Sequence, residues 1–208
     1  MLPILASILN PQDLISKGGL PIVAAIIFAE TGLLIGFFLP GDSLLFIAGF
    51  LASKPPKLPH LPVLPLVLVT VVAAAIVGNQ VGYLIGHRVG PALYSRPDSR
   101  LFKQAHVDKA RSFFARYGDR TLVLARFVPI VRTFVPVLAG VSNMDARRFL
   151  RFNVVGAVLW GGLITTAGYF LGQRPFIRNH IEVSVLALVA LSLLPVGIEL
   201  MRHRRRAA

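Results

Sequence analysis

The sequence predicts an all-α integral membrane protein: an inverted repeat of two re-entrant helical hairpins, with about three transmembrane helices and amphipathic interfacial helices. Three observations predict this fold. Hydrophobic residues make up 55% of the 208 residues and charged residues only 15%, with a mean hydropathy of +0.70. Apolar stretches of span length recur, and two further apolar stretches contain prolines and charges. A soluble domain is about a quarter charged, so the composition excludes a water-soluble enzyme and a disordered chain.

The chain is strongly basic, with 22 Lys and Arg against 9 Asp and Glu and a net charge of +13. The basic residues lie between the apolar stretches, which is typical of membrane topology, so we expect no nucleic-acid partner. The absence of cysteine excludes disulfides, thiolate metal sites and cysteine nucleophiles. No metal-ligand cluster is visible, and we expect neither a metal nor a cofactor. Residues 1–17 lack a basic start and a cleavage site, so we expect no removable signal peptide.

Three apolar stretches are long enough to cross a hydrocarbon core of roughly 30 Å as single helices. They cover residues 61–86, 152–172 and 181–201.

Two other stretches are interrupted. Residues 20–52 are too long for one span and too short for two, and Pro40-Gly41 breaks them near the middle. Residues 121–141 contain two arginines and two prolines, which a helix facing lipid would not tolerate. Broken backbone at membrane depth survives only where protein buries it or where it lines a wet cavity. We therefore predict that each stretch enters the membrane and returns on the same side.

The distribution of positive charge predicts the topology. The basic tail, residues 202–208, is expected in the cytoplasm. The connector, residues 87–120, carries eight Lys and Arg, and it shares the side of the tail only if residues 121–141 do not span. The connector also resembles an amphipathic helix on the membrane surface, with apolar residues at helical spacing. These are Phe102, Val107, Ala110, Phe113 and Phe114, and a solvated basic loop is the alternative.

An internal repeat organises these segments. The segment Gly82-Tyr83-Leu84-Ile85-Gly86-His87-Arg88 matches Gly168-Tyr169-Phe170-Leu171-Gly172-Gln173-Arg174 at an offset of 86 residues. Upstream, Phe38-Leu39-Pro40 with Ala48-Gly49 matches Phe127-Val128-Pro129 with Ala139-Gly140. We predict one membrane domain over residues 1–208, with repeats at about 20–90 and 121–175 that enter from opposite sides. Paired broken helices of this kind are the architecture of secondary transporters, whose substrate site lies near the bilayer midplane.

Glycines spaced by four accompany the repeat, at positions 78, 82 and 86 and again at 168 and 172. Small residues at this spacing allow membrane helices to approach closely. We expect them to serve helix packing.

Four charged residues lie inside the apolar stretches: Glu30, Asp42, Arg126 and Arg132. Each costs about 2.5–3.5 kcal/mol at the centre of a membrane helix, so we predict that they share one polar cavity between the hairpins. Arginine stays charged, and its planar fork suits phosphate, which predicts that Arg126 and Arg132 bind a phosphate group. Glu30 and Asp42 are predicted to accept protons, or to occupy the arginines when no anion is bound. Structural ion pairs between the two halves are the alternative.

Five further polar residues are predicted to line the same cavity: Asn79, Gln80, Tyr83, Thr133 and Asn153. Asn and Gln inside membrane helices most often join helices by hydrogen bonds. Trp160 lies in the middle of a span, away from the interfacial belt, and is expected to serve packing.

These motifs resemble those of the DedA family of bacterial inner-membrane proteins, within the VTT/SNARE-associated domain superfamily. The resemblance covers about residues 20–175 and rests on Glu30, on Phe38-Leu39-Pro40-Gly41-Asp42, on Gly78-Asn79-Gln80-Val81-Gly82-Tyr83, and on the block from Arg126-Phe127-Val128-Pro129 to Trp160. It implies a multi-pass protein of the bacterial cell inner membrane, linked to protons or membrane potential, that carries undecaprenyl phosphate or a phospholipid. It also implies that the acidic pair and the arginine pair are essential. Asn79 stands where many members carry Asp, and Asp42 where Glu is common, which leaves the coupling ion open.

Other functions were weighed against lipid translocation. A proton-coupled antiporter of small cations or drugs would use the acidic pair alone. A lipid phosphatase is disfavoured because the five histidines lie in loops, the connector or the tail, outside any setting for nucleophilic attack. A purely structural protein leaves four buried charges unexplained. We therefore expect a protein that is not an enzyme and whose partners are a membrane lipid and protons, and the sequence also allows a homo-oligomer.

Overall fold

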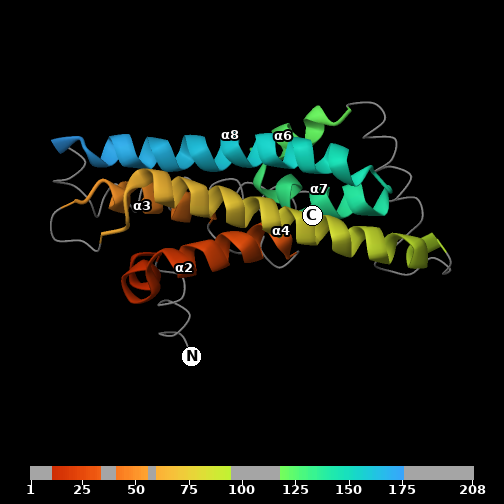
Figure 1. Cartoon of the computed structure of the whole chain (residues 1–208), viewed down its shortest axis with the longest axis horizontal. Coiled ribbons are helices and arrows are strands. Elements are labelled where there is room, and N and C mark those ends of the chain that lie inside the picture. Colours follow the sequence, from red (N-terminus) through yellow and green to blue (C-terminus); the bar gives the residue numbers. More distant parts are fainter. Residues whose placement is uncertain (1–10, 34–40, 56–59, 95–117, 176–208) are drawn as a thin grey trace, which may run out of the picture. The chain divides into compact units, whose positions relative to one another are not determined.

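The computed structural model describes residues 11–33, 41–55, 60–94 and 118–175. Within these ranges every regular element is a helix, which confirms the all-α prediction (Figure 1). The helices are α2 (Pro11–Gly32), α3 (Gly41–Ala52), α4 (Leu64–Tyr94), α6 (Arg120–Ala125), α7 (Pro129–Val141) and α8 (Ala146–Gly172).

The chain forms two compact units. Unit 1 comprises Met1–Val23, Pro40–Leu68 and Ile164–Ala208, and unit 2 comprises Ala24–Leu39 and Val69–Leu163. Helices α2, α4 and α8 each contribute to both units, and each unit is described below by itself.

Two helices have the length and apolar composition of membrane spans: Leu64–Gly90 within α4, and Ala146–Gly172, which is α8. Each has 27 residues, or about 40 Å at the helical rise. Their exposed side chains include Val69, Val77, Leu163 and Phe170, an arrangement that favours hydrocarbon over water. The chain is therefore an all-α membrane protein. Both helices exceed the predicted spans, because α4 continues past His87 and Arg88 and α8 begins six residues before Phe152.

The first interrupted stretch holds two helices. α2 begins at Pro11, earlier than predicted, and kinks where Gly19 adopts a positive φ of 59° shortly before Pro21. It ends at Gly32, and α3 begins at Gly41, the predicted break. The predicted helix at 181–201, the basic tail and residues 95–117 of the connector lie outside the described residues.

The second interrupted stretch breaks where the sequence predicts. α6 ends at Ala125 with Arg126 as its C-cap, Val128 is extended (φ −113°, ψ 106°), and Pro129 opens α7. Proline disfavours helical geometry in the preceding residue and is well tolerated at the first helical position. The Val-Pro step therefore separates two short helices and leaves Arg126 at their junction.

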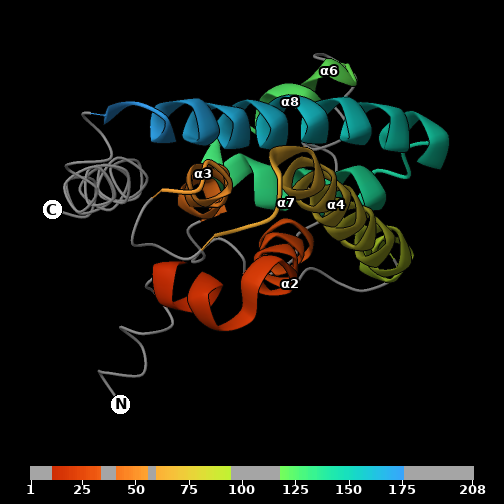
Figure 2. The ribbon, with the colours of Figure 1, turned by 60° about the vertical axis from the view of Figure 1, so that its left-hand side comes forward.

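In unit 2, α4 and α7 touch through their main chains (Figure 2). A Cβ atom at Gly86 would overlap the carbonyl of Val137, and one at Gly140 would overlap the carbonyl of Tyr83. The expectation that these glycines serve close helix packing is confirmed.

Unit 1 holds a corresponding contact between α3 and the last turns of α8, which lie side by side in Figures 1 and 2. A Cβ atom at Gly168 would overlap the carbonyl of Phe46, and one at Gly49 would overlap the carbonyl of Thr165. We call these two glycine contacts, α4 with α7 and α3 with α8, the glycine joints.

The two glycine joints share one register. Gly140 and Val137 lie 91 positions after Gly49 and Phe46, and Gly168 lies 82 positions after Gly86. Equivalent contacts on the two long helices are therefore 82 residues apart. The matching sequence motifs are 86 residues apart, a difference of about one helical turn.

Replacing Gly86 with alanine should destabilise the protein by about 1–3 kcal/mol, because the new methyl group meets backbone that must move. Gly168→Ala should do the same in unit 1. The matched control is Gly162→Ala on α8, whose Cβ would meet nothing within 4 Å. That variant should be neutral or gain about 0.5–1 kcal/mol of helix stability. Thermal unfolding in detergent measures all three, and equal melting temperatures would contradict the glycine joints.

Candidate functional site

Three of the four predicted charged residues come together in unit 2. Glu30, Arg126 and Arg132 are 1%, 2% and 8% exposed, so their charges are almost wholly removed from solvent. Asp42 lies in the first turn of α3, in unit 1, and is half-buried. Asp42 thus belongs to a different unit from the other three charged residues.

Glu30 and Arg132 form a buried ion pair. Glu30 lies in the last turn of α2 and Arg132 in the first turn of α7, 102 positions later. Arg132 Nη2 donates to Glu30 Oε1. Removing one partner of a buried pair leaves an uncompensated charge and typically costs about 3–5 kcal/mol.

Arg126, in contrast, has only neutral polar partners among the described residues. Its Nη2 donates to Asn153 Oδ1 of α8 at 2.5 Å. With the amide of Asn79 turned so that its oxygen faces the guanidinium, that oxygen accepts from Arg126 Nη2 at 2.8 Å. The Nε atom of Arg126 is buried and has no hydrogen-bond partner in the described part of the chain. A buried cation with neutral partners would be stabilised further by a nearby anion.

The two asparagines also join helices. The side-chain nitrogen of Asn153 donates to the carbonyl of Ile76 in α4 at 3.0 Å. In the turned orientation, the nitrogen of Asn79 donates to the carbonyl of Thr31 in α2 at 2.9 Å. Arg126 is therefore fixed by residues that also hold α2, α4 and α8 in register.

Trp160 of α8 lies against both arginines. The guanidinium carbons of Arg126 and Arg132 are 5.8 and 5.0 Å from the centroid of its ring, and Trp160 is 1% exposed. Both distances allow a cation–π interaction. The sequence interpretation of Trp160 as a packing residue missed this contact.

Gly156 gives Arg126 room beside α8. A Cβ atom at Gly156 would lie 2.8 Å from Arg126 Cδ and 3.0 Å from its Nε. Asn153, Gly156 and Trp160 follow one another at spacings of three and four, so they share one face of α8. That spacing in an otherwise apolar helix was the signal available in the sequence.

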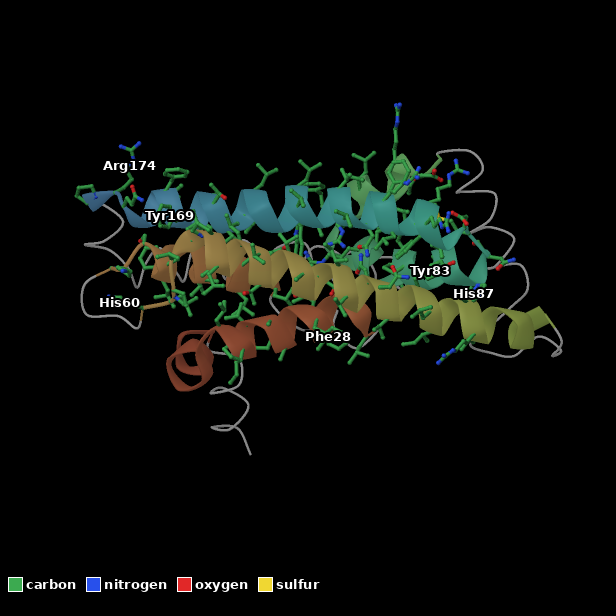
Figure 3. All side chains as sticks on the ribbon, viewed as in Figure 1. Phe28, His60, Tyr83, His87, Tyr169 and Arg174 are labelled. Carbon is green, nitrogen blue, oxygen red and sulfur yellow. The ribbon has the colours of Figure 1, made fainter. Side chains whose placement is uncertain are left out.

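The remaining predicted residues have other surroundings. Tyr83 donates its hydroxyl to the carbonyl of Met144 at 2.5 Å and stacks on Phe149, with a centroid distance of 4.5 Å. The ring of His87 also stacks with that of Tyr83, with a centroid distance of 5.9 Å, and Figure 3 labels both residues. These contacts give Tyr83 a packing role between α4 and the start of α8.

Thr133, next to Arg132, is buried. Gln80 is half-buried, and within the described ranges its side-chain oxygen has no hydrogen-bond partner. In the part of the chain that the structure describes, no three His, Asp or Glu residues lie close enough to hold a metal ion.

The chain resembles known proteins over most of its length. The VTT domain model matches residues 39–170. Protein DedA of Escherichia coli K12 is 44% identical over 187 residues, covering 90% of this chain and 84% of that protein. An uncharacterized membrane protein of Mycobacterium leprae is 45% identical over 190 residues, covering 91% and 83%.

A more distant relative is the inner membrane protein YghB of Escherichia coli K12. It is 32% identical over 179 residues, covering 85% of this chain and 80% of that protein. No solved structure matches the chain significantly. The domain match and the identity to the relatives agree with the motifs found in the sequence and with a location in the bacterial inner membrane. The chain therefore belongs to the DedA family of membrane proteins and carries a VTT domain.

Proposed function

We propose that this protein moves a lipid phosphate across the bacterial inner membrane, with undecaprenyl phosphate or a phospholipid as cargo, in a step linked to protons or to membrane potential. The observation that carries the proposal is Arg126. Its guanidinium is 2% exposed, and among the described residues its hydrogen-bond partners are neutral and its Nε–H has no acceptor. Such a group gains most from an anion that accepts from the guanidinium fork.

Phosphate fits this demand better than a simple anion. Its several oxygens can accept from Nε and Nη of Arg126 and from Arg132 at the same time. The exposed apolar side chains of α4 and α8 would let a prenyl or acyl tail stay in hydrocarbon while the headgroup crosses. In this proposal Gln80 and Thr133 line the headgroup path.

Glu30 acts as the gate. Its carboxylate occupies Arg132, in the way that a bound phosphate oxygen would. Protonation of Glu30 removes that charge and makes Arg132 available to the lipid phosphate. Asp42, in the first turn of α3, is proposed as a second proton acceptor.

The two glycine joints support an inverted repeat, with repeats at about 20–90 and 121–175 of a single membrane domain. Each joint pairs a short helix of one half with the long helix of the other. We propose that both interrupted stretches re-enter the membrane and that the basic tail lies in the cytoplasm, since these arrangements keep the basic connector and the tail on one side.

Proton-coupled antiport of small cations or drugs is less well supported. A cation would need a carboxylate to bind it, and the carboxylate of Glu30 is already paired with Arg132. Cation antiport also gives no role to the buried charge of Arg126.

Arg126→Gln should lower lipid-phosphate flipping about a hundredfold or more, because it removes the buried charge that binds the headgroup. Asn153→Ala should lower it about tenfold, the loss expected for one hydrogen bond to a charged group. Proteoliposomes with a fluorescent prenyl phosphate, and separately with a fluorescent phospholipid, measure the rate and identify the cargo.

Arg148→Gln is the matched control. Arg148 is exposed and pairs with Asp119, so its loss should leave the rate unchanged. Unchanged flipping in the Arg126→Gln, Arg132→Gln double variant would contradict the proposal. Cation transport by the same vesicles without lipid movement would favour the antiporter.

Glu30→Gln tests the gate. This variant should be less stable without lipid by about 3–5 kcal/mol, since Arg132 loses its counter-charge. Farnesyl phosphate should then raise the melting temperature more in Glu30→Gln than in the unmodified protein, because the anion supplies the missing charge. Adding Arg132→Gln should abolish the extra shift. Equal ligand-induced shifts in all three proteins would show that Glu30 does not compete with the anion.

A further inference from the structure

One feature of the site is not used by the proposed transport step. Trp160 is the sole tryptophan of the chain, and it is buried in the middle of a membrane helix. Tryptophan in membrane proteins favours the interface, where its N–H reaches water. Its ring instead faces two guanidinium groups.

The two arginines belong to different helices. Arg126 closes α6, Arg132 lies in α7, and the extended Val128 separates the two helices. In one continuous helix, residues six apart would point about 120° away from each other. The break at Val128 therefore allows both side chains to approach Trp160 of α8.

Two guanidinium groups at one site repel each other, most strongly where water is excluded. The face of an indole ring carries partial negative charge and attracts cations, more than phenylalanine or tyrosine does. A single ring within 6 Å of both cations offsets this repulsion without adding a formal charge. The ring thus limits the repulsion and leaves the positive charge of Arg126 available to a phosphate.

The face of α8 beside the ring continues the same arrangement. Asn153 accepts from Arg126 Nη2, and Gly156 leaves space for the Arg126 side chain. With Trp160, these residues supply an acceptor, a gap and an aromatic surface along two turns of one helix.

We infer that Trp160 is a positioning residue: its ring holds Arg126 and Arg132 together so that both point at one phosphate group. That the anion is a phosphate rests on the proposed function. The contact of the Trp160 ring with the two arginines does not depend on that function. The inference differs from a packing role because it depends on the charge distribution of the ring as well as its size.

Fluorinated tryptophan separates these two properties. Each added fluorine weakens the negative face of the indole while changing its volume little, and a chain with one tryptophan is labelled at Trp160 alone. In nanodiscs of zwitterionic lipid, the affinity for farnesyl phosphate should fall with each added fluorine. Trp160→Leu, which removes the ring, should lower the affinity about tenfold to thirtyfold.

The control is Gly162→Ala on the same helix, whose added Cβ would meet nothing within 4 Å, and it should leave the affinity unchanged. A constant affinity across the fluorinated series, with a loss only in Trp160→Leu, would overturn the inference and assign Trp160 to packing.

A second measurement needs no lipid phosphate. Because all tryptophan emission comes from residue 160, Arg126→Gln and Arg132→Gln should each change the emission maximum or lifetime, whereas Arg148→Gln should change neither. An emission maximum and lifetime that stay the same in both Arg126→Gln and Arg132→Gln would overturn the inference. Failure of the unmodified protein to bind farnesyl phosphate, with emission still sensitive to both arginines, would instead contradict the proposed function and leave the ring contact supported.

Discussion

The architecture of unit 2 depends on keeping a buried positive charge where water cannot reach it. Arg126 is held by the amides of Asn79 and Asn153 and by the ring of Trp160, and these come from α4 and α8. Neutral dipoles stabilise a cation without cancelling its charge, and the proposed phosphate site depends on that charge. A carboxylate in their place would give a tighter resting structure and a weaker site. Arg132, in contrast, is stabilised by a carboxylate, that of Glu30.

Much of the fold follows from local rules. The break between α6 and α7 was predictable because proline restricts its predecessor whatever surrounds it. The burial of Glu30, Arg126 and Arg132 was predictable because lipid excludes charge. The ends of the spans were not, since helical hydrogen bonds continue through His87 and Arg88 once the apolar stretch is over. A polar residue marks the edge of the membrane and need not mark the end of a helix.

The pairings inside the site could not be predicted. Nothing local indicates that Glu30 selects Arg132 rather than Arg126, because the partners lie 102 positions apart. Trp160 was hidden for a related reason: an aromatic residue at helical spacing in an apolar helix is usually core. The motif around Tyr83 likewise gave no indication of the contacts that this residue makes with Met144 and Phe149.

The glycine joints carry a consequence for how such a chain can evolve. Each joint is a meeting of peptide groups, so its geometry depends on the absence of side chains at Gly49, Gly86, Gly140 and Gly168. Substitutions at exposed positions of these helices leave that spacing unchanged. The exposed surface of the chain can therefore diverge in sequence while the glycines keep the distance between the helices.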